Sequence, residues 1–426
     1  MCVGSGIELA QNFYKRIRPN ITPAKINIFK RFGTAMIKFN NYNIEFVGAR
    51  KESYSNDSRK PSIEEGTFLD DMLRRDFTIN TLAIRLNKNY FGELIDTFGG
   101  IDDIEKGIIK TPTDPNKTFS DDPLRMLRAI RFSCELNFDI DMNTQNSIKK
   151  NSNRLEILSS ERISDEINKI LMSETPSNGF KNLEKLNLLN HVLPELIDLK
   201  GVEEVEGQTH KDNFYHTLEV VDNISRNTEN VWLRWAALLH DIGKAPTKKF
   251  SKKIGWTFHG HEFIGSKMVK KIFTRLSLPL NEKLKYVQKI VMMSSRPIII
   301  SEDIVTDSAV RRLIYDAGDD IDDLLTLCEA DITTKNMKKS LIYQNNFKIV
   351  RQKIKDVEER DSIRNFQPPI TGEMIMAYFN IKPCKEIGLI KENIKNAILD
   401  GDIRNDYKEA HDLMVKIGKS LGLKDE

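Results

Sequence analysis

The sequence predicts an α+β protein with a small N-terminal head of mixed helices and strands, followed by a long and mostly α-helical remainder. Two strand-like runs at residues 34–39 and 43–47 are joined at Asn40-Asn41, which predicts a β-hairpin. From about Ser120 onward, apolar residues recur at helical spacing, as do Leu124, Leu127 and Ile130. The sheet is therefore expected in the head, and helices in the remainder.

The pattern divides the chain into four predicted domains. A glycine turn, Val3-Gly4-Ser5-Gly6, leads into a helix-like segment in the head, and one strand signal at 255–258 interrupts the later helices. A helical tail begins near Pro368-Pro369. The expected domains are a head at 1–86, a helical neck and body at 87–204, a second helical domain at 205–355 and a helical tail at 356–426.

Composition indicates an ordinary globular protein of 426 residues with 30% charged residues and a net charge of +3. This balance neither requires nor excludes a nucleic-acid partner, because a basic face can exist in a nearly neutral chain. The four cysteines are far apart and form no pair typical of a zinc site or a disulfide framework. No apolar run approaches the roughly 20 residues of a membrane span. We expect a cytoplasmic protein with reduced thiols and no membrane segment.

Arg74, Arg75, Asp76 and Asn80 form the strongest candidate for a nucleotide site. Guanidinium groups match the oxygens of a triphosphate, and a carboxylate and an amide can hold ribose hydroxyl groups. An Arg-Arg-Asp triplet alone is more often a surface salt-bridge network. The full string from Arg74 to Asn80 is much more specific.

Further motifs follow in order along the chain. Asp122 and Arg125 are three residues apart, which predicts that they share a helical face and can reach the edge of a base. Arg128 continues this basic face. The other candidates are Asp96, Gly99 and Gly100 as a flexible segment, with a simple turn as the alternative, and the pair of Arg162 and Glu166.

Together these motifs resemble the CCA-adding tRNA nucleotidyltransferases, a family that shares its head with the poly(A) polymerases. The resemblance implies a nucleotidyltransferase palm in the head, base selection by Asp122 and Arg125 without a nucleic-acid template, and a structural brace formed by Arg162 and Glu166. It implies the tRNA acceptor arm, ATP, CTP and Mg²⁺ as partners. CC-only, A-only and full CCA addition remain alternatives, as does poly(A) synthesis.

One expected feature does not precede the motifs. The family places an Asp-x-Asp pair that holds the catalytic metals just before a turn like Val3-Gly4-Ser5-Gly6, and the sequence begins at Met1. We therefore expect an incomplete palm in a chain that is shortened by a misplaced start, is a fragment, or is a decayed copy of the enzyme. Loss of nucleotide transfer and transfer that survives without this pair are both open alternatives. Glu45 is the remaining candidate for a metal-facing catalytic carboxylate, and an ordinary strand glutamate is the alternative.

A second constellation consists of His216, His240, Asp241 and Asp331. Imidazoles and carboxylates suit a divalent metal, and a metal-bound water can attack a phosphate ester. The set resembles the HD phosphohydrolase superfamily, which implies Mg²⁺, Mn²⁺, Ni²⁺ or Zn²⁺ at this site, with His259 and His261 as accessory residues. A stand-alone phosphohydrolase and a non-catalytic HD fold that packs against tRNA are the alternatives.

Overall fold

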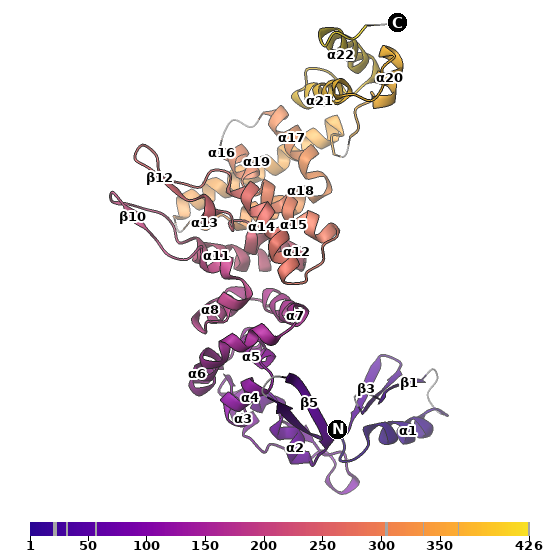
Figure 1. Ribbon diagram of the computed structural model, residues 1–426, viewed down its shortest axis with the longest axis vertical. Helices are drawn as coiled ribbons and strands as arrows, with labels where there is room; N and C mark the ends of the chain where they lie inside the picture. Colours follow the sequence, from indigo (N-terminus) through magenta and orange to yellow (C-terminus); the bar gives the residue numbers. More distant parts are fainter. Residues whose placement is uncertain are drawn as a thin grey trace. The chain divides into compact units, whose positions relative to one another are not determined.

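The computed structural model describes residues 1–19, 24–30, 33–55, 58–302, 306–334, 336–364 and 366–424. These residues form two compact units, Met1–Ile197 and Asp198–Glu426 (Figure 1). The predicted fold class is confirmed: strands are short and few, and the body and the second unit are helical. The division into four domains stays a prediction.

The first unit begins with a helix on a three-stranded antiparallel sheet. Its elements are α1 (Gly6–Ile17), β1 (Ala24–Phe29), β2 (Thr34–Phe39) and β3 (Tyr42–Val47). The predicted hairpin is confirmed, because β2 pairs with β3 and Asn40 takes the left-handed conformation at the turn with φ 48°. Buried Ala10 of α1 packs against buried Ala35 and Ile37 of β2.

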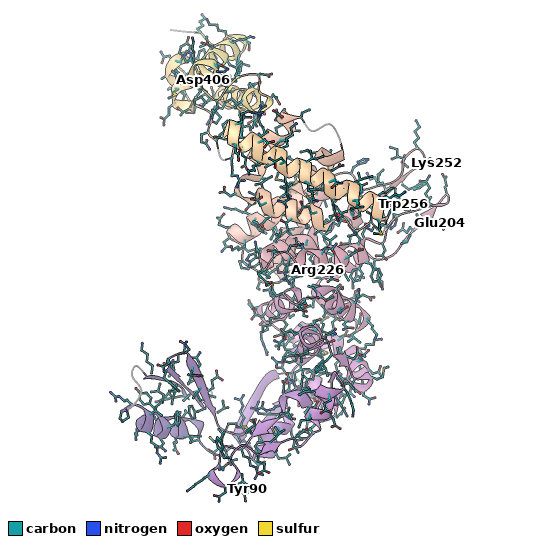
Figure 2. All side chains as sticks on the ribbon, turned by 180° about the vertical axis from the view of Figure 1, so that it is seen from behind. Tyr90, Glu204, Arg226, Lys252, Trp256 and Asp406 are labelled. Carbon is teal, nitrogen blue, oxygen red and sulfur yellow. The ribbon has the colours of Figure 1, made fainter. Side chains whose placement is uncertain are left out.

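The head continues through a series of short strands and helices. They are β4 (Arg50–Ser55), β5 (Ser58–Glu65), α2 (Phe68–Leu73), the 3₁₀ turn η2 (Thr78–Asn80), β6 (Ala83–Ile84), η3 (Lys88–Tyr90), β7 (Leu94–Ile95), α3 (Gly100–Glu105) and β8 (Ile108–Ile109). β4 pairs with β5, and β6 pairs with β7, both antiparallel. Tyr90 lies at the end of the β6–β7 hairpin (Figure 2).

The rest of the first unit is helical, apart from β9 (Asp139–Ile140), which pairs with β8 in parallel. Its helices are α4 (Pro115–Asp121), α5 (Leu124–Leu136), α6 (Met142–Asn151), η4 (Ser152–Ile157), α7 (Ser160–Leu171), α8 (Pro176–Lys185), α9 (Leu189–Val192) and α10 (Pro194–Ile197). α5 packs against α7 and α8. The helical spacing predicted for this region is confirmed, since Leu127 and Ile130 are fully buried on one face of α5.

The second unit is a bundle of helices with a helical tail. Its helices are α11 (Asn213–Ser225), α12 (Val231–Leu239), α13 (Lys244–Thr247), α14 (His261–Arg275), α15 (Glu282–Met293), α16 (Arg296–Glu302), α17 (Asp307–Ala317), η5 (Gly318–Asp320), α18 (Ile321–Ala330), α19 (Met337–Asp361), α20 (Gly372–Phe379), α21 (Lys385–Asp400) and α22 (Tyr407–Ser420). The apolar α12 lies between α11, α15 and α18, and its Trp235 is fully buried.

Two small hairpins extend from this bundle. They are β10 (Glu204–Val205) with β11 (Gln208–Thr209), and β12 (Lys249–Ser251) with β13 (Gly255–Thr257). The strand predicted at 255–258 is thus confirmed. Figure 2 shows Glu204, Lys252 and Trp256 near one another, and the Trp256 indole donates a hydrogen bond to the Gln208 carbonyl over 3.1 Å.

Two further properties concern the described residues as a whole. None of their helices is both long and apolar enough to cross a membrane. All four cysteines are free thiols.

Candidate functional sites

The first unit contains a cavity of about 600 Å³ that gathers most of the predicted nucleotide-binding residues. Six arginines and three aspartates line it. The lining residues are Met1, Val47, Arg50, Asp71, Arg74, Arg75, Asp76, Asn80, Asp122, Leu124, Arg125, Arg128, Phe132 and Arg162. The tertiary structure thus brings together segments near residues 75 and 125, as a shared nucleotide site requires.

Asp71 holds two of the cavity arginines and was not predicted as a site residue. Its fully buried carboxylate accepts hydrogen bonds from Arg74 Nε over 2.9 Å and from Arg75 Nη2 over 3.3 Å. Arg75 also donates to the carbonyl of Asn80 over 2.9 Å. The signal in the sequence was an aspartate three and four residues before the two arginines, which follow the end of α2.

Asp76 forms a second fixed group in the cavity. One of its carboxylate oxygens accepts from Arg128 Nε over 2.6 Å, and the other accepts from Asn80 Nδ2 over 2.9 Å. The side chain of Asp76 is only 9% exposed. Asp76, Asn80 and Arg128 are therefore a connected hydrogen-bonded set.

Asp122 and Arg125 line the same cavity, but the prediction that they share the face of one helix is wrong. Asp122 ends α4 in an extended conformation with φ −138°, and α5 begins only at Leu124. Pro123 is the cause, because the residue before a proline is driven out of the helical region.

The donors of Arg125 and the carboxylate of Asp122 have partners on several elements. Arg125 Nη2 donates to the Arg74 carbonyl over 2.6 Å. Asp122 accepts from the Leu124 backbone over 3.1 Å and lies 3.4 Å from Arg162 Nη2. Arg162, predicted as a brace, therefore also belongs to the cavity.

The segment with Asp96, Gly99 and Gly100 caps a helix beside the cavity. The Asp96 carboxylate accepts from the backbone of Gly100 over 2.7 Å and of Ile101 over 3.0 Å at the start of α3. Burial opposes ionisation, but these N–H donors outweigh it and lower the pKa of Asp96. Gly99 has φ 71°, and a Cβ at Gly100 would lie 2.6 Å from the Thr78 carbonyl. Gly100 thus permits close packing of α3 on η2, and its flexibility stays a prediction.

Glu166 lies in the interior of the helical body, where a brace is expected. Its carboxylate is 4% exposed and pairs with Arg131 of α5 over 2.8 Å and with Lys169 over 3.1 Å. The pair with Arg131 connects α7 to α5. This contact agrees with a structural role, which remains a prediction.

The residues described in the head do not form a Mg²⁺ site. Glu45 is exposed on β3 and does not line the cavity, whereas Val47, two residues farther along the strand, does. Asp71 and Asp76, the two acidic residues that lie deepest, are already paired with arginines. The catalytic role of Glu45 therefore stays a prediction that the cavity does not support.

The second unit brings three of the four predicted HD residues to one point. The ligand atoms of His216, His240 and Asp331 all lie within 4.8 Å of one another. His216 comes from α11, His240 follows α12, and Asp331 ends α18. Asp331 Oδ1 is 2.8 Å from His216 Nε2 and 3.6 Å from His240 Nε2. We call these three residues the triad.

Asp241 faces the triad, but its carboxylate is paired with the ammonium group of Lys244. Its Oδ2 lies 3.4 Å from His240 Nε2 and accepts a hydrogen bond from Lys244 Nζ over 2.6 Å. The accessory residues differ from each other: His261 Nε2 lies 3.6 Å from Asp241 Oδ1, while His259 is exposed.

The charges around the triad shift the pKa values of His240 and Asp331. Burial alone would lower the pKa of His240, but Asp241 and Asp331 outweigh it and raise the pKa to about 9. Burial opposes ionisation of Asp331, yet the neighbouring His216 and His240 imidazoles hold its pKa well below the usual range. The metal-free triad therefore favours charged histidine beside charged aspartate.

His240 is oriented as a metal ligand would be. Its Nδ1 donates to the Ala237 carbonyl over 2.8 Å, which leaves Nε2 as the coordinating atom. Among the described residues, that Nε2 is buried with no hydrogen-bond partner. The donor set of His240, His216 and Asp331 thus fits a divalent metal.

Two residues missed by sequence reasoning lie behind His216. Lys211 Nζ is 2.8 Å from His216 Nδ1 and donates to Thr333 Oγ1 over 2.6 Å. Lys211, His216, Asp331 and Thr333 also line a second cavity of about 580 Å³. Lys211 precedes α11 and Thr333 follows α18, more than a hundred residues later. The sequence pattern therefore did not indicate that the two side chains meet.

Comparison with known proteins adds three matched families along the chain. The poly(A) polymerase head domain matches residues 4–110, the probable RNA- and SrmB-binding site of polymerase A matches residues 137–199, and the HD domain matches residues 213–336. The residues matched to the head domain include the cavity arginines Arg50, Arg74 and Arg75, and those matched to the HD domain include the whole triad.

Similar proteins have related names. The chain is 29% identical over 343 residues to the A-adding tRNA nucleotidyltransferase of Deinococcus radiodurans. This alignment covers 78% of this chain and 76% of that protein. It is 42% identical over 154 residues to the CCA-adding enzyme of Limosilactobacillus reuteri, covering 35% of this chain and 37% of that one. It is 35% identical over 240 residues to the multifunctional CCA protein of Shewanella frigidimarina, covering 55% and 54%.

Solved structures share the fold. An apo form of a CCA-adding enzyme aligns with a TM-score of 0.62 at 23% identity, covering 98% of this chain and 86% of that one. The Thermotoga maritima CCA-adding enzyme, solved with tRNA, aligns with a TM-score of 0.57 at 22% identity, covering 98% and 85%. The poly(A) polymerase head, the RNA-binding site of polymerase A and the HD domain thus match in this order along the chain, and the similar proteins named above are tRNA nucleotidyltransferases and CCA-adding enzymes.

Proposed function

We propose that the chain is a tRNA nucleotidyltransferase that adds CCA to tRNA 3′ ends from CTP and ATP. The cavity of the first unit is the observation that carries this proposal. Its arginines are already oriented by buried carboxylates, and it also contains groups that can hydrogen-bond a base. The names of the similar proteins support the same activity.

Under this proposal, three groups of cavity residues bind the triphosphate, the ribose and the base of the nucleotide. Arg74 and Arg75, held by Asp71, bind the triphosphate through their remaining N–H groups. Asp76 and Asn80 receive the ribose hydroxyl groups. Asp122 and Arg125 present an acceptor and donors to the base, so the side chains themselves select the nucleotide.

Nucleotidyl transfer in this family depends on divalent metal, which supplies charge neutralisation and activates the attacking hydroxyl group. The residues described in the head do not offer a ligand set for Mg²⁺, so no step is assigned to Glu45. The arginines still bind and orient the nucleotide without it. Binding and transfer can therefore be tested separately.

The decisive experiment measures incorporation of labelled CTP and ATP, with Mg²⁺, into tRNA that lacks its CCA end. A parallel protein carries an added upstream strand with an Asp-x-Asp pair. Incorporation by both proteins would make Glu45 the next residue to substitute. Incorporation only with the added strand would support a cavity that lacks its metal ligands. ATP and CTP that bind to neither protein would contradict the proposal.

The choice among A addition, CCA addition and poly(A) synthesis follows from the acceptor used. We expect CTP to be added to tRNA that ends at its discriminator base, and ATP to be added to tRNA that ends in CC. Extension of CC-ended tRNA alone would favour A addition. Long A tracts on an unrelated RNA would favour a poly(A) polymerase.

The helical body is proposed to hold the tRNA acceptor arm through its backbone. Lys149 and Lys150 are exposed at the end of α6, within the matched RNA-binding region. Contacts of this kind release counterions, so tRNA affinity should decrease steeply with salt. A binding constant that is independent of salt would argue against this surface.

The triad supports a second candidate function, metal-dependent hydrolysis of a phosphate ester such as a 2′,3′-cyclic phosphate. The buried Nε2 of His240, without a partner among the described residues, is the observation that favours it. When bound, a divalent metal would supply a water of lowered pKa, and Mn²⁺, Ni²⁺, Zn²⁺ and Mg²⁺ all remain candidates.

Substitution Asp241→Ala tests this second function. We expect loss of hydrolysis of a 2′,3′-cyclic nucleotide and unchanged incorporation of CTP and ATP. His240→Ala should also remove one bound Mn²⁺ per chain in a direct binding measurement. An unchanged Mn²⁺ stoichiometry in His240→Ala would contradict a metal at the triad.

A further inference from the structure

The contact behind His216 distinguishes the two histidines of the triad. His240 directs Nδ1 at a backbone carbonyl, Ala237 O, which can only accept a hydrogen bond. His216 directs Nδ1 at the ammonium group of Lys211, 2.8 Å away, and at the hydroxyl group of Thr333, 3.0 Å away. An ammonium group has three donors and no acceptor.

This difference decides which nitrogen of His216 carries the hydrogen. If Lys211 donates to Nδ1, that nitrogen supplies its lone pair, and Nε2 carries the hydrogen. That Nε2 lies 2.8 Å from Asp331 Oδ1, on the side of the ring that faces the triad. In this arrangement the nitrogen that faces the triad has no lone pair for a metal.

Lys211 has a second effect through its charge. It lies on the far side of the His216 ring from the triad, and it also contacts Thr333 over 2.6 Å. A divalent cation at the triad would meet this positive charge across one imidazole ring. Because Lys211 as a residue is partly open to solvent, the repulsion is weakened but not removed.

We propose that Lys211 is a positioning residue that holds His216 in a form unable to ligate and thereby lowers the affinity of the triad for divalent metal. This inference rests on the metal site proposed above and assigns to it a built-in restraint. Metal binding requires that Lys211 leave Nδ1. Thr333 Oγ1 can then accept the Nδ1 hydrogen, as carbonyl groups do behind other ligating histidines.

The test compares Mn²⁺ binding to the full chain and to Lys211→Met by calorimetry and by the electron paramagnetic resonance signal of free Mn²⁺. We expect the triad to bind Mn²⁺ about tenfold more tightly in Lys211→Met. Lys211→Arg keeps the positive charge and should retain the weaker binding. Lys270→Met, an exposed lysine of α14, makes the same change in net charge and should leave the affinity unchanged.

The His240→Ala background separates the triad from any other Mn²⁺ site, because the gain from Lys211→Met should vanish there. A second readout does not need metal. In long-range ¹H–¹⁵N spectra of histidine-labelled protein, His216 should carry its hydrogen on Nε2 in the original chain. It should shift toward Nδ1 in Lys211→Met.

Three outcomes would overturn the inference. One is an equal or weaker Mn²⁺ affinity in Lys211→Met, with the folded bundle confirmed by its circular dichroism. Another is a His216 that already carries its hydrogen on Nδ1 in the original chain. The third is a triad that binds no Mn²⁺ in any variant, which would remove the proposed metal site as well. Should Lys211→Met fail to fold, Lys211→Gln is the replacement variant, with the same expected gain.

Discussion

The cavity of the first unit and the triad of the second unit place their charges in opposite ways. In the cavity, the side chains of Arg74 and Arg75 are 20% and 35% exposed, while the aspartate that orients them is fully buried. In the triad, the His216 and His240 side chains are only 7% and 3% exposed, beside the carboxylates of Asp331, which is 20% exposed, and Asp241, which is 3% exposed. The cavity thus offers oriented cations to an anion from solvent, whereas the triad encloses a place for a cation.

The two sites also differ in what holds their working groups. Asp71 holds its arginines within one helical turn, and the contact from Arg125 to Arg74 connects α5 to α2. The triad depends on three helix ends that meet only in the folded bundle. One lysine contacts His216, a member of the triad, and another contacts Asp241 beside it. A positive charge prepares the first site for its ligand and restrains the second.

The largest expected effect is that of Asp71→Asn, which removes the charge that orients two arginines and keeps the shape. We expect ATP affinity and nucleotide incorporation to fall about 100-fold, because misplaced guanidinium groups no longer match the triphosphate. Isothermal titration with ATP measures the first effect. Mn²⁺ binding at the triad serves as the control, and an unchanged ATP affinity would show that Asp71 does not prepare the cavity.

The next effect concerns base choice. Arg125→Ala should reduce discrimination between CTP and ATP by about tenfold or more, because a side chain that hydrogen-bonds a base contributes on the order of 1–3 kcal/mol of selectivity. Arg128→Ala is the matched control, since Arg128 pairs with Asp76 and should weaken both nucleotides alike. Competition between labelled CTP and ATP measures this ratio. Equal losses in both variants would refute base reading by Arg125.

The pH dependence of stability tests the triad. Because the folded-state pKa of His240, about 9, exceeds its ordinary value of 6.5, its protonation stabilises the metal-free fold. This contribution is fully present below pH 6.5 and is lost as the pH rises through about 9. Urea unfolding with a chelator present should therefore show the second unit weakening across this window, by on the order of a few kcal/mol.

The control for this pH effect is His240→Gln, which cannot take up a proton. Its stability should be lower at pH 6.5 and should change less between pH 6.5 and 9. Excess Mn²⁺ should reduce the slope in the original chain, since metal replaces the proton at Nε2. Identical pH profiles in the two proteins would argue that His240 is not protonated in the metal-free fold.

The smallest effect is a packing test beside the cavity. Gly100→Ala should destabilise the first unit by about 1–3 kcal/mol, because the new Cβ would lie 2.6 Å from the Thr78 carbonyl. Gly388→Ala is the matched control in α21, where a Cβ meets nothing within 4 Å, and it should be neutral or slightly stabilising. Equal unfolding free energies would instead mean that α3 moves freely against η2.

Local patterns in the sequence were sufficient for many of the elements. The hairpin at Asn40 and the helix containing Leu127 and Ile130 were predictable because side-chain period and turn residues act over a few neighbours. The helix expected to include Asp122 failed at Pro123. A proline interrupts a helix, and the spacing between Asp122 and Arg125 was interpreted without taking Pro123 into account.

The sites were predictable as residue types rather than as contacts. Arg74, Asp76, Asp122 and Arg125 were identified from their order along the chain, and they line one cavity. The role of Asp71 was missed because an aspartate near arginines is common on helices. Lys211 was missed because it lies before the start of α11, so helical spacing does not predict its contact with His216, and because its other partner, Thr333, is more than a hundred residues away.

The amino-acid sequence by itself determined the α+β class, the helical body and the kinds of chemistry present, because these depend on short-range spacing and on side-chain type. The tertiary structure decided which charges meet. Only folding places the ammonium group of Lys211 behind His216 and the carbonyl of Arg74 against Arg125. The physical reason is that electrostatic and hydrogen-bond contacts depend on distances of a few ångströms, which sequence separation does not contain.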